Sequence, residues 1–135
     1  MKKNILILSL IFAFSALSAS DFEDFGGMKK INKIVNEFSV KLQANEQMKS
    51  FFVESDMERF KSKLAEQFCA ELGGPCKYTG KNMKRAHKGH DIKASHFYKL
   101  VEVLQETMRE NNVSLRMQNK LLAKLAPMNK DVINH

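Results

Sequence analysis

The stretch GGPCKYTGKNMKRAHKGH, residues 73–90, holds four glycines, a proline, a cysteine and two histidines between two regions of regular apolar periodicity. The glycines and proline at 73–75 end the preceding helix, because neither residue type continues a helix readily. Asn82 or Thr79 is positioned to cap a following helix, NMKRAHKG, which its closing glycine limits to two turns. The stretch therefore predicts a loop followed by a short helix that carries His87.

Apolar residues outside this stretch recur at three- and four-residue spacing, which places them on one face of amphipathic helices. The spacing predicts long helices over residues 28–44, 57–72, 95–108 and 114–125, with the short helix in the middle. Phe51 and Phe52 are too apolar for an exposed turn, and we expect them to face inward. No segment shows the alternation of a half-buried strand. The fold class is therefore all-α, with five or six helices in one domain.

The first 20 residues, MKKNILILSLIFAFSALSAS, have the composition of a secretory signal, with two lysines, an apolar run and small residues at a cleavage site. A membrane anchor is the alternative, but the run from Ile5 to Leu17 is shorter than the roughly 20 residues that a spanning helix needs. We expect cleavage before Asp21, or one or two residues earlier, and export to the periplasm of a Gram-negative bacterium. The domain then comprises residues 21–135, without a stable membrane anchor.

The charge of the exported chain is modest. Loss of Lys2 and Lys3 leaves 20 basic residues against 15 acidic ones, so the formal net charge falls from +7 to +5. The lysines are mostly interleaved with acids, and no arginine-rich block or aromatic stripe marks a nucleic-acid surface. We therefore expect a solvated exterior, no nucleic-acid partner and a monomer.

Cys69 and Cys76 are the two cysteines of the chain and stand seven positions apart. In an oxidising compartment such a pair favours an internal disulfide. Two separate thiols, one of them buried, are the alternative. A metal site is a weaker interpretation, because neither cysteine belongs to a CxxC pair.

Taken in order, several motifs resemble the group I truncated haemoglobins. They are DFGG before the first long helix, KSFF at its far end, DMERFKSKLAEQFCAELGGPCKYTG, NMKRAHKGHDIKASHF and the closing LAP. The resemblance runs from about Asp21 to Val132. It implies a truncated globin fold, a two-over-two helical sandwich around haem b, with His87 as the proximal iron ligand. On spacing alone, a histidine on a short helix is more often a surface or capping residue.

The abundance of ten phenylalanines and eight methionines, without tryptophan, suits a core that surrounds a wide apolar cofactor, although the same residues can simply pack a core. The resemblance further implies that Phe52 packs against the haem and that the distal side is lined by four residues of one helix. These are Phe60, Lys63, Leu64 and Phe68. Met83 adds an apolar contact beside His87, and Tyr78, with lysines such as Lys61 or Lys84, is placed to meet the haem propionates.

At two distal positions the chain departs from the family, which often has tyrosine and glutamine donors there. The matching residues are Ser39 and Leu64. A bound O₂ then loses hydrogen bonding of about 1 to 3 kcal/mol, while CO and NO depend less on such donors. Lys63 matches a position that supplies a sixth iron ligand in some members. The alternative is a lysine whose ammonium reaches solvent or a propionate, since deprotonating lysine is costly.

These features predict an exported haem globin that binds O₂, NO or CO, for NO or O₂ handling or haem redox chemistry. As an enzyme it would be an NO dioxygenase or a weak peroxidase, and either activity needs an electron donor that the sequence does not identify. The alternative function is a haem-free helical periplasmic interaction module, whose glycine loop merely joins helices.

Overall fold

The structure is a computed structural model that describes residues 20–134, so the predicted signal peptide lies outside the described residues except for Ser20. All regular secondary structure of the described residues is helical, and they contain no strand. Its elements are α1 (Asp21–Phe25), α2 (Gly27–Ala44), η1 (Lys49–Phe52), α3 (Met57–Glu71), α4 (Met83–His87), α5 (Ala94–Glu110), α6 (Leu115–Leu125), η2 (Ala126–Met128) and α7 (Asn129–Val132). Within residues 20–134, no helix combines the length and apolarity needed to cross a membrane.

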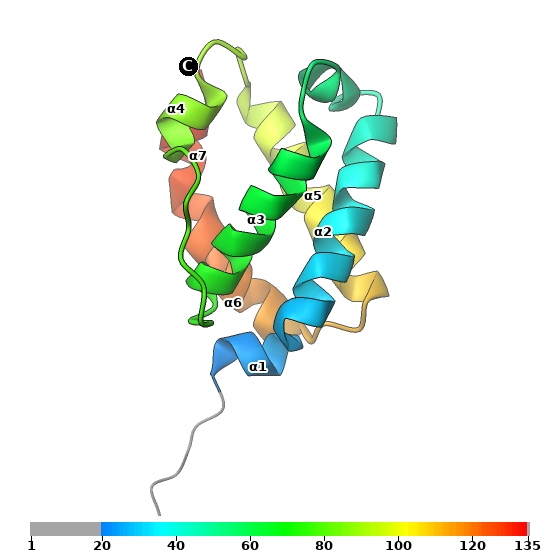
Figure 1. Cartoon of the computed structure of the whole chain (residues 1–135). Helices are drawn as coiled ribbons and strands as arrows, with labels where there is room; N and C mark the ends of the chain where they lie inside the picture. The colour runs from blue at the N-terminus through cyan, green and yellow to red at the C-terminus, as the bar shows by residue number, and fades with distance from the viewer. Residues whose placement is uncertain (1–19, 135) are drawn as a thin grey trace, which may run out of the picture.

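Four long helices form two layers of two (Figure 1). Helix α2 packs against α3 and α5, and α6 packs against the same two helices from the other layer. The shared core is apolar, and its most buried members come from all four helices: Ile31, Ile34, Phe38, Leu42, Phe68, Leu104, Met108 and Leu121. The predicted amphipathic stripes therefore meet at the centre, because each helix buries its apolar face against the others.

The predicted helix starts are confirmed where a side chain caps the helix. Asp56 Oδ1 accepts a hydrogen bond from the Arg59 amide at 3.1 Å and starts α3. Asn82, rather than Thr79, caps α4. Ser114 caps α6 through the Met117 amide at 3.2 Å. These contacts are local, so they can be read from the sequence.

Several predicted boundaries differ from the structure by one or two residues, including the end of α5, which lies at Glu110 instead of Met108. The first long helix begins at Gly27 instead of Met28, and a separate short helix, α1, precedes it across Gly26 at φ +123°. Helix α5 begins at Ala94 rather than Ser95. The chain also continues past Pro127 through η2 into α7. Proline is tolerated there because a residue in the first turn of a helix makes no intrahelical N–H hydrogen bond that proline would remove.

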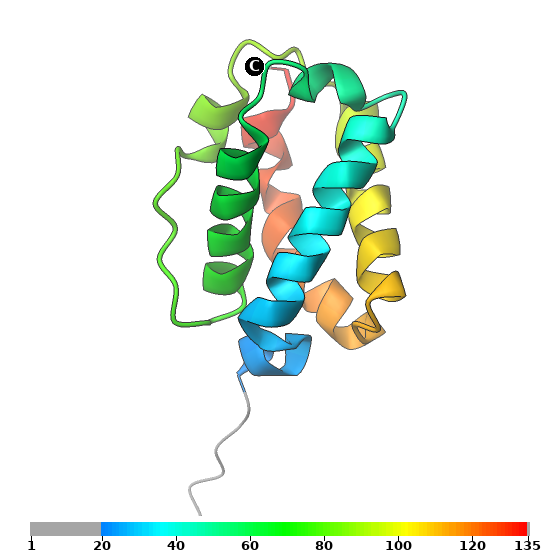
Figure 2. The same ribbon diagram turned by 45° about the vertical axis from the view of Figure 1, so that its right-hand side comes forward.

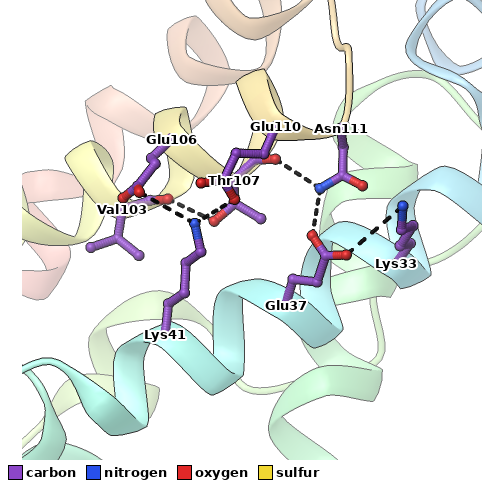
Figure 3. A network of polar contacts seen from close by, with 8 residues as sticks. All are labelled: Lys33, Glu37, Lys41, Val103, Glu106, Thr107, Glu110 and Asn111. Atoms are coloured by element: carbon purple, nitrogen blue, oxygen red, sulfur yellow. Dashed lines mark hydrogen bonds and ion pairs between the residues drawn. The ribbon is translucent and has the colours of Figure 1, made fainter.

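A polar network joins α2 to α5 on the outside of the core (Figure 3). Lys41 Nζ lies 2.7 Å from Glu110 Oε2 and 3.5 Å from Glu106 Oε1. At the end of α5, buried Asn111 donates to Glu37 Oε2 at 2.6 Å and to the Thr107 carbonyl at 2.8 Å. The network therefore fixes how α5 lies on α2.

Candidate functional site

A cavity of about 430 Å³ lies between the layers and is bounded by α3 on one side and α4 on the other. Six of the eight phenylalanines among residues 20–134 line it, and they come from four elements. They are Phe38, Phe51, Phe52, Phe60, Phe68 and Phe97. Leucines and methionines complete the wall, so the cavity is predominantly apolar and has the size of a small-molecule or cofactor site.

His87 enters this cavity from α4 and is half-buried. Its Nδ1 lies 2.7 Å from the Met83 carbonyl oxygen, one turn earlier on the same helix. A carbonyl only accepts, so Nδ1 carries the proton and Nε2 keeps its lone pair. Burial lowers the pKa of His87, partly opposed by the hydrogen bond to Met83. A neutral, oriented imidazole of this kind is the form that binds a metal.

The opposite wall comes mainly from α3. The four residues assigned to it from the resemblance all line the cavity: Phe60, Lys63, Leu64 and Phe68. Phe52 meets Phe60 edge to face, with ring centroids 5.2 Å apart. The phenylalanines of η1 and α3 thus line the same cavity as His87, and Leu64 presents no hydrogen-bond donor to it.

Ser39 lies differently from the other predicted site residues. It is fully buried on α2, does not line the cavity, and its hydroxyl donates to the Asn36 carbonyl at 2.8 Å. Its neighbour Phe38 lines the wall instead. The hydroxyl at this position is therefore occupied within its own helix.

Lys63 lines the cavity with its side chain, but its ammonium is engaged elsewhere. Nζ donates to Thr79 Oγ1 and lies 3.3 Å from Glu66 Oε1. Glu66 accepts hydrogen bonds from the Thr79 amide at 3.0 Å and from the Thr79 hydroxyl. These two bonds, together with Lys63, lower the pKa of the Glu66 carboxyl. The arrangement matches the alternative in which the lysine reaches toward the surface, and coordination by Lys63 stays a prediction.

The cations that line the cavity are Arg59, Lys63 and Lys81. The two lysines named from the sequence as propionate partners, Lys61 and Lys84, are not among them: Lys61 pairs with Glu58 at 2.6 Å, and Lys84 is exposed on α4. The reason is that Lys61 and Lys84 lie on faces of α3 and α4 that do not line the cavity, which their charge alone does not indicate. Tyr78 does line the cavity; it donates to the Lys81 carbonyl, and burial raises its pKa, so it stays protonated.

Gln67 is a site residue that the sequence reasoning missed. It is buried on α3, lines the cavity, and its amide nitrogen lies 3.6 Å from the Met83 sulfur and 3.3 Å from the Met128 sulfur. Its signal was a polar residue at i+3 from Leu64 and i+7 from Phe60, on the apolar face of the helix. His90 and His96 also line the cavity, His96 with its ring 4.9 Å from that of Phe51.

The two cysteines form a disulfide that joins the end of α3 to the loop, with Cα atoms 5.8 Å apart. Gly74 lies directly against it, since a Cβ there would stand 2.7 Å from Cys69 Sγ and 2.5 Å from Cδ2 of Phe22. From this staple the chain runs back along the outside of α3 to α4 (Figure 2). The disulfide therefore anchors one end of the segment that positions His87.

The residues present fit a haem. The cavity offers phenylalanine side chains for a flat apolar ring, an imidazole with a free Nε2 for the iron, and two cations, Arg59 and Lys81, for two propionates. When bound, the haem would supply an iron that can take a diatomic ligand.

Comparison with known proteins agrees with this chemistry. Residues 20–134 match a family model described as "Bacterial-like globin". The group 1 truncated hemoglobin GlbN of Mycolicibacterium paratuberculosis is 33% identical over 114 residues, 84% of each chain. That of Tetrahymena thermophila is 39% identical over 94 residues, covering 69% of this chain and 77% of the relative.

Solved structures show the same fold. The truncated hemoglobin of Tetrahymena pyriformis in its Fe(III) form superposes with a TM-score of 0.82 at 31% identity, covering 87% of this chain and 100% of the other. The 2/2 hemoglobin of Synechococcus, in the cyanomet state with covalently attached heme, gives 0.80 at 28% identity, with the same coverage. The chain therefore belongs to the bacterial-like globin family, among the truncated haemoglobins of two-over-two fold, whose cofactor is haem b.

Proposed function

We propose that this protein is an exported, monomeric haem globin that binds diatomic gases at iron held by His87, and that it handles NO or O₂ or performs haem redox chemistry. The observation that carries the proposal is the apolar cavity faced by a neutral imidazole with a free Nε2. Bulk oxygen storage is less well supported, because the usual distal donors are absent.

Each part of the cavity has a distinct task in this proposal. The Met83 carbonyl holds the His87 ring so that Nε2 faces the cavity. Phe52 and Phe60 cover the apolar ring and exclude water from it. Arg59 and Lys81 neutralise the propionates, as their place on the wall supports.

Distal chemistry separates the candidate ligands. The Ser39 hydroxyl donates to the Asn36 carbonyl, and the Leu64 side chain has no hydrogen-bond donor. Without a donor, bound O₂ lacks about 1 to 3 kcal/mol of hydrogen bonding, which corresponds to roughly 5- to 150-fold in affinity. CO and NO carry less charge when bound and lose less. We therefore expect affinities that favour NO and CO over O₂, compared with members that keep the donors.

An optical experiment tests the cofactor and its ligand. Protein produced with haem available should show a Soret band that shifts with CO, and His87→Gly should lose it and recover it partly with external imidazole. His90→Ala is the matched control, because His90 also lines the cavity but should leave the band unchanged. A wild-type protein without a Soret band, equally stable after the His87 change, would instead support the haem-free interaction module.

Export and activity need separate measurements. N-terminal sequencing of the protein from a periplasmic extract should begin at Asp21, or one or two residues before it. Stopped-flow O₂ release and NO consumption would distinguish a carrier or sensor from an NO dioxygenase. A dioxygenase or a peroxidase cycle requires an electron donor, and the weak distal hydrogen bonding counts against fast dioxygenation.

A further inference from the structure

The net positive charge of the domain is concentrated in one segment. Residues 77–93 contain six basic residues and one acid, whereas the rest of the chain from Asp21 onward contains 14 basic and 14 acidic residues. The interleaving of charge expected from the sequence thus holds outside this segment and fails within it. The segment is the one that carries His87.

The cations of α4 are exposed and have no acidic partner. We call Lys84, Arg85 and Lys88 the α4 cationic face; all three are exposed, and none forms an ion pair with another described residue. Elsewhere, seven lysines of the described surface pair with carboxylates. Asp91, the single acid of the segment, pairs with Lys93: its Oδ2 lies 3.9 Å from Lys93 Nζ. The α4 cationic face is therefore uncompensated.

Helix geometry places this face on the side of α4 next to the iron ligand, turned away from the cavity. Met83 and His87, one turn apart, line the cavity, while Lys84 and Lys88, also one turn apart, are exposed and do not line it. A helix with its side chains is about 10 Å across, so a protein docked on the cationic face would lie about that far from the cavity. The rate of electron transfer falls steeply with distance. A carrier docked on this face would lie a short distance from the cavity, with the His87 ring between them.

We propose that the α4 cationic face docks an acidic one-electron carrier protein, with a flavin or iron–sulfur centre, that reduces the ferric haem. The inference rests on the proposed haem function and names the missing electron donor by its surface chemistry. In the step, the carrier centre loses one electron, the ferric iron gains it, and no bond forms or breaks. Small interfaces with charge steering are typical of such transient encounters.

The patch is better suited to a protein than to a polyanion or a bilayer. Three charges, two on the five-residue helix α4 and one at its C-cap, Lys88, form a compact spot rather than a stripe along a nucleic-acid backbone. Large apolar side chains that would insert into a bilayer are missing from the face, which consists of two lysines and an arginine. An anionic membrane remains an outcome that the experiment below would reveal.

The test follows reduction of the ferric protein by an acidic plant-type [2Fe–2S] ferredoxin, reduced beforehand, in a stopped-flow instrument. At about 10 mM salt the double variant Lys84→Glu/Lys88→Glu should slow the second-order rate tenfold or more. Raising salt to about 150 mM should slow the wild type and leave the variant nearly unchanged. The control Lys29→Glu/Arg116→Glu makes the same charge change at exposed, unpaired positions and should slow the rate much less than the α4 variant, because it changes only the overall charge.

Two readouts separate docking from damage to the site. A small neutral reductant, photoreduced deazariboflavin, should reduce all three proteins at equal rates. Oxidised ferredoxin, titrated into ¹⁵N-labelled protein, should shift backbone amides of residues 83–88 and not those around Lys29. Equal ferredoxin rates for the wild type and the α4 variant would overturn the proposal.

Binding to vesicles of phosphatidylcholine with one-third phosphatidylglycerol gives the competing outcome. Vesicle binding that requires Lys84 and Lys88, with no effect of these residues on ferredoxin rates, would assign the face to membranes and refute carrier docking. Failure of the proposed function is distinguishable, because it would appear as a missing Soret band before any carrier is added.

Discussion

Opening the Cys69–Cys76 disulfide should destabilise the domain and release haem faster. The bridge closes a loop with a sequence separation of seven, for which the chain-entropy relation gives about 2.4 kcal/mol at 25 °C. For a domain of this length that corresponds to a fall of about 10 °C in Tm. The loop beyond the bridge leads to α4, so the added freedom reaches the element that holds His87.

Two assays measure these effects. Thermal unfolding followed by circular dichroism gives Tm for the oxidised protein, the reduced protein and Cys76→Ser, a variant that leaves Cys69 in its buried position. Haem transfer to an excess of apomyoglobin gives the rate of haem loss for the same three samples. Reductant should change neither value for Cys76→Ser, which controls for effects of the reductant itself. Equal Tm and equal haem-loss rates for the oxidised and reduced protein would refute the reasoning.

Three further changes have defined outcomes. Leu64→Gln restores a distal donor and should slow O₂ release about 5- to 150-fold with little effect on CO, as flash photolysis would show. Asn111→Ala removes buried hydrogen bonds to Glu37 and Thr107 and should cost about 1 to 2 kcal/mol by urea unfolding, with the Soret band unchanged. Hydrogen bonding to Lys41 lowers the pKa of Glu110 from its ordinary value. The stabilisation by this pair is therefore present above the ordinary pKa of glutamate and is lost as the pH falls through the lowered pKa. Lys41→Met should weaken the dependence of Tm on pH in this range.

Local patterns account for the part of the fold that was predictable. The long helices follow from apolar periodicity. The starts of α3, α4 and α6 follow from Asp56, Asn82 and Ser114, whose side chains cap within three residues. The short helices α1 and α7 escaped prediction because five and four residues carry too little periodicity. Contacts with α2, α6, α4 and α5 hold these two helices in place.

The candidate site divides in the same way. His87, Phe60 and Leu64 were identified from motifs, and the structure brings them to one cavity. The orientation of the polar groups was not predictable: Gln67 turns its amide toward two thioethers, and Lys63 turns its ammonium toward Glu66. Each orientation depends on partners from another element or on competing neighbours that a spacing rule does not contain.

By itself, the sequence determined the long helices and the glycine punctuation of residues 73–90, and it predicted His87 as the iron ligand, because these depend on neighbours within a few positions and on recognisable motifs. Only the tertiary structure decided that six phenylalanines from four elements enclose one cavity, that Ser39 lies behind its wall, and that the cations of α4 face outward next to His87. The physical reason is that burial and side-chain direction depend on how distant helices pack, which no local pattern specifies.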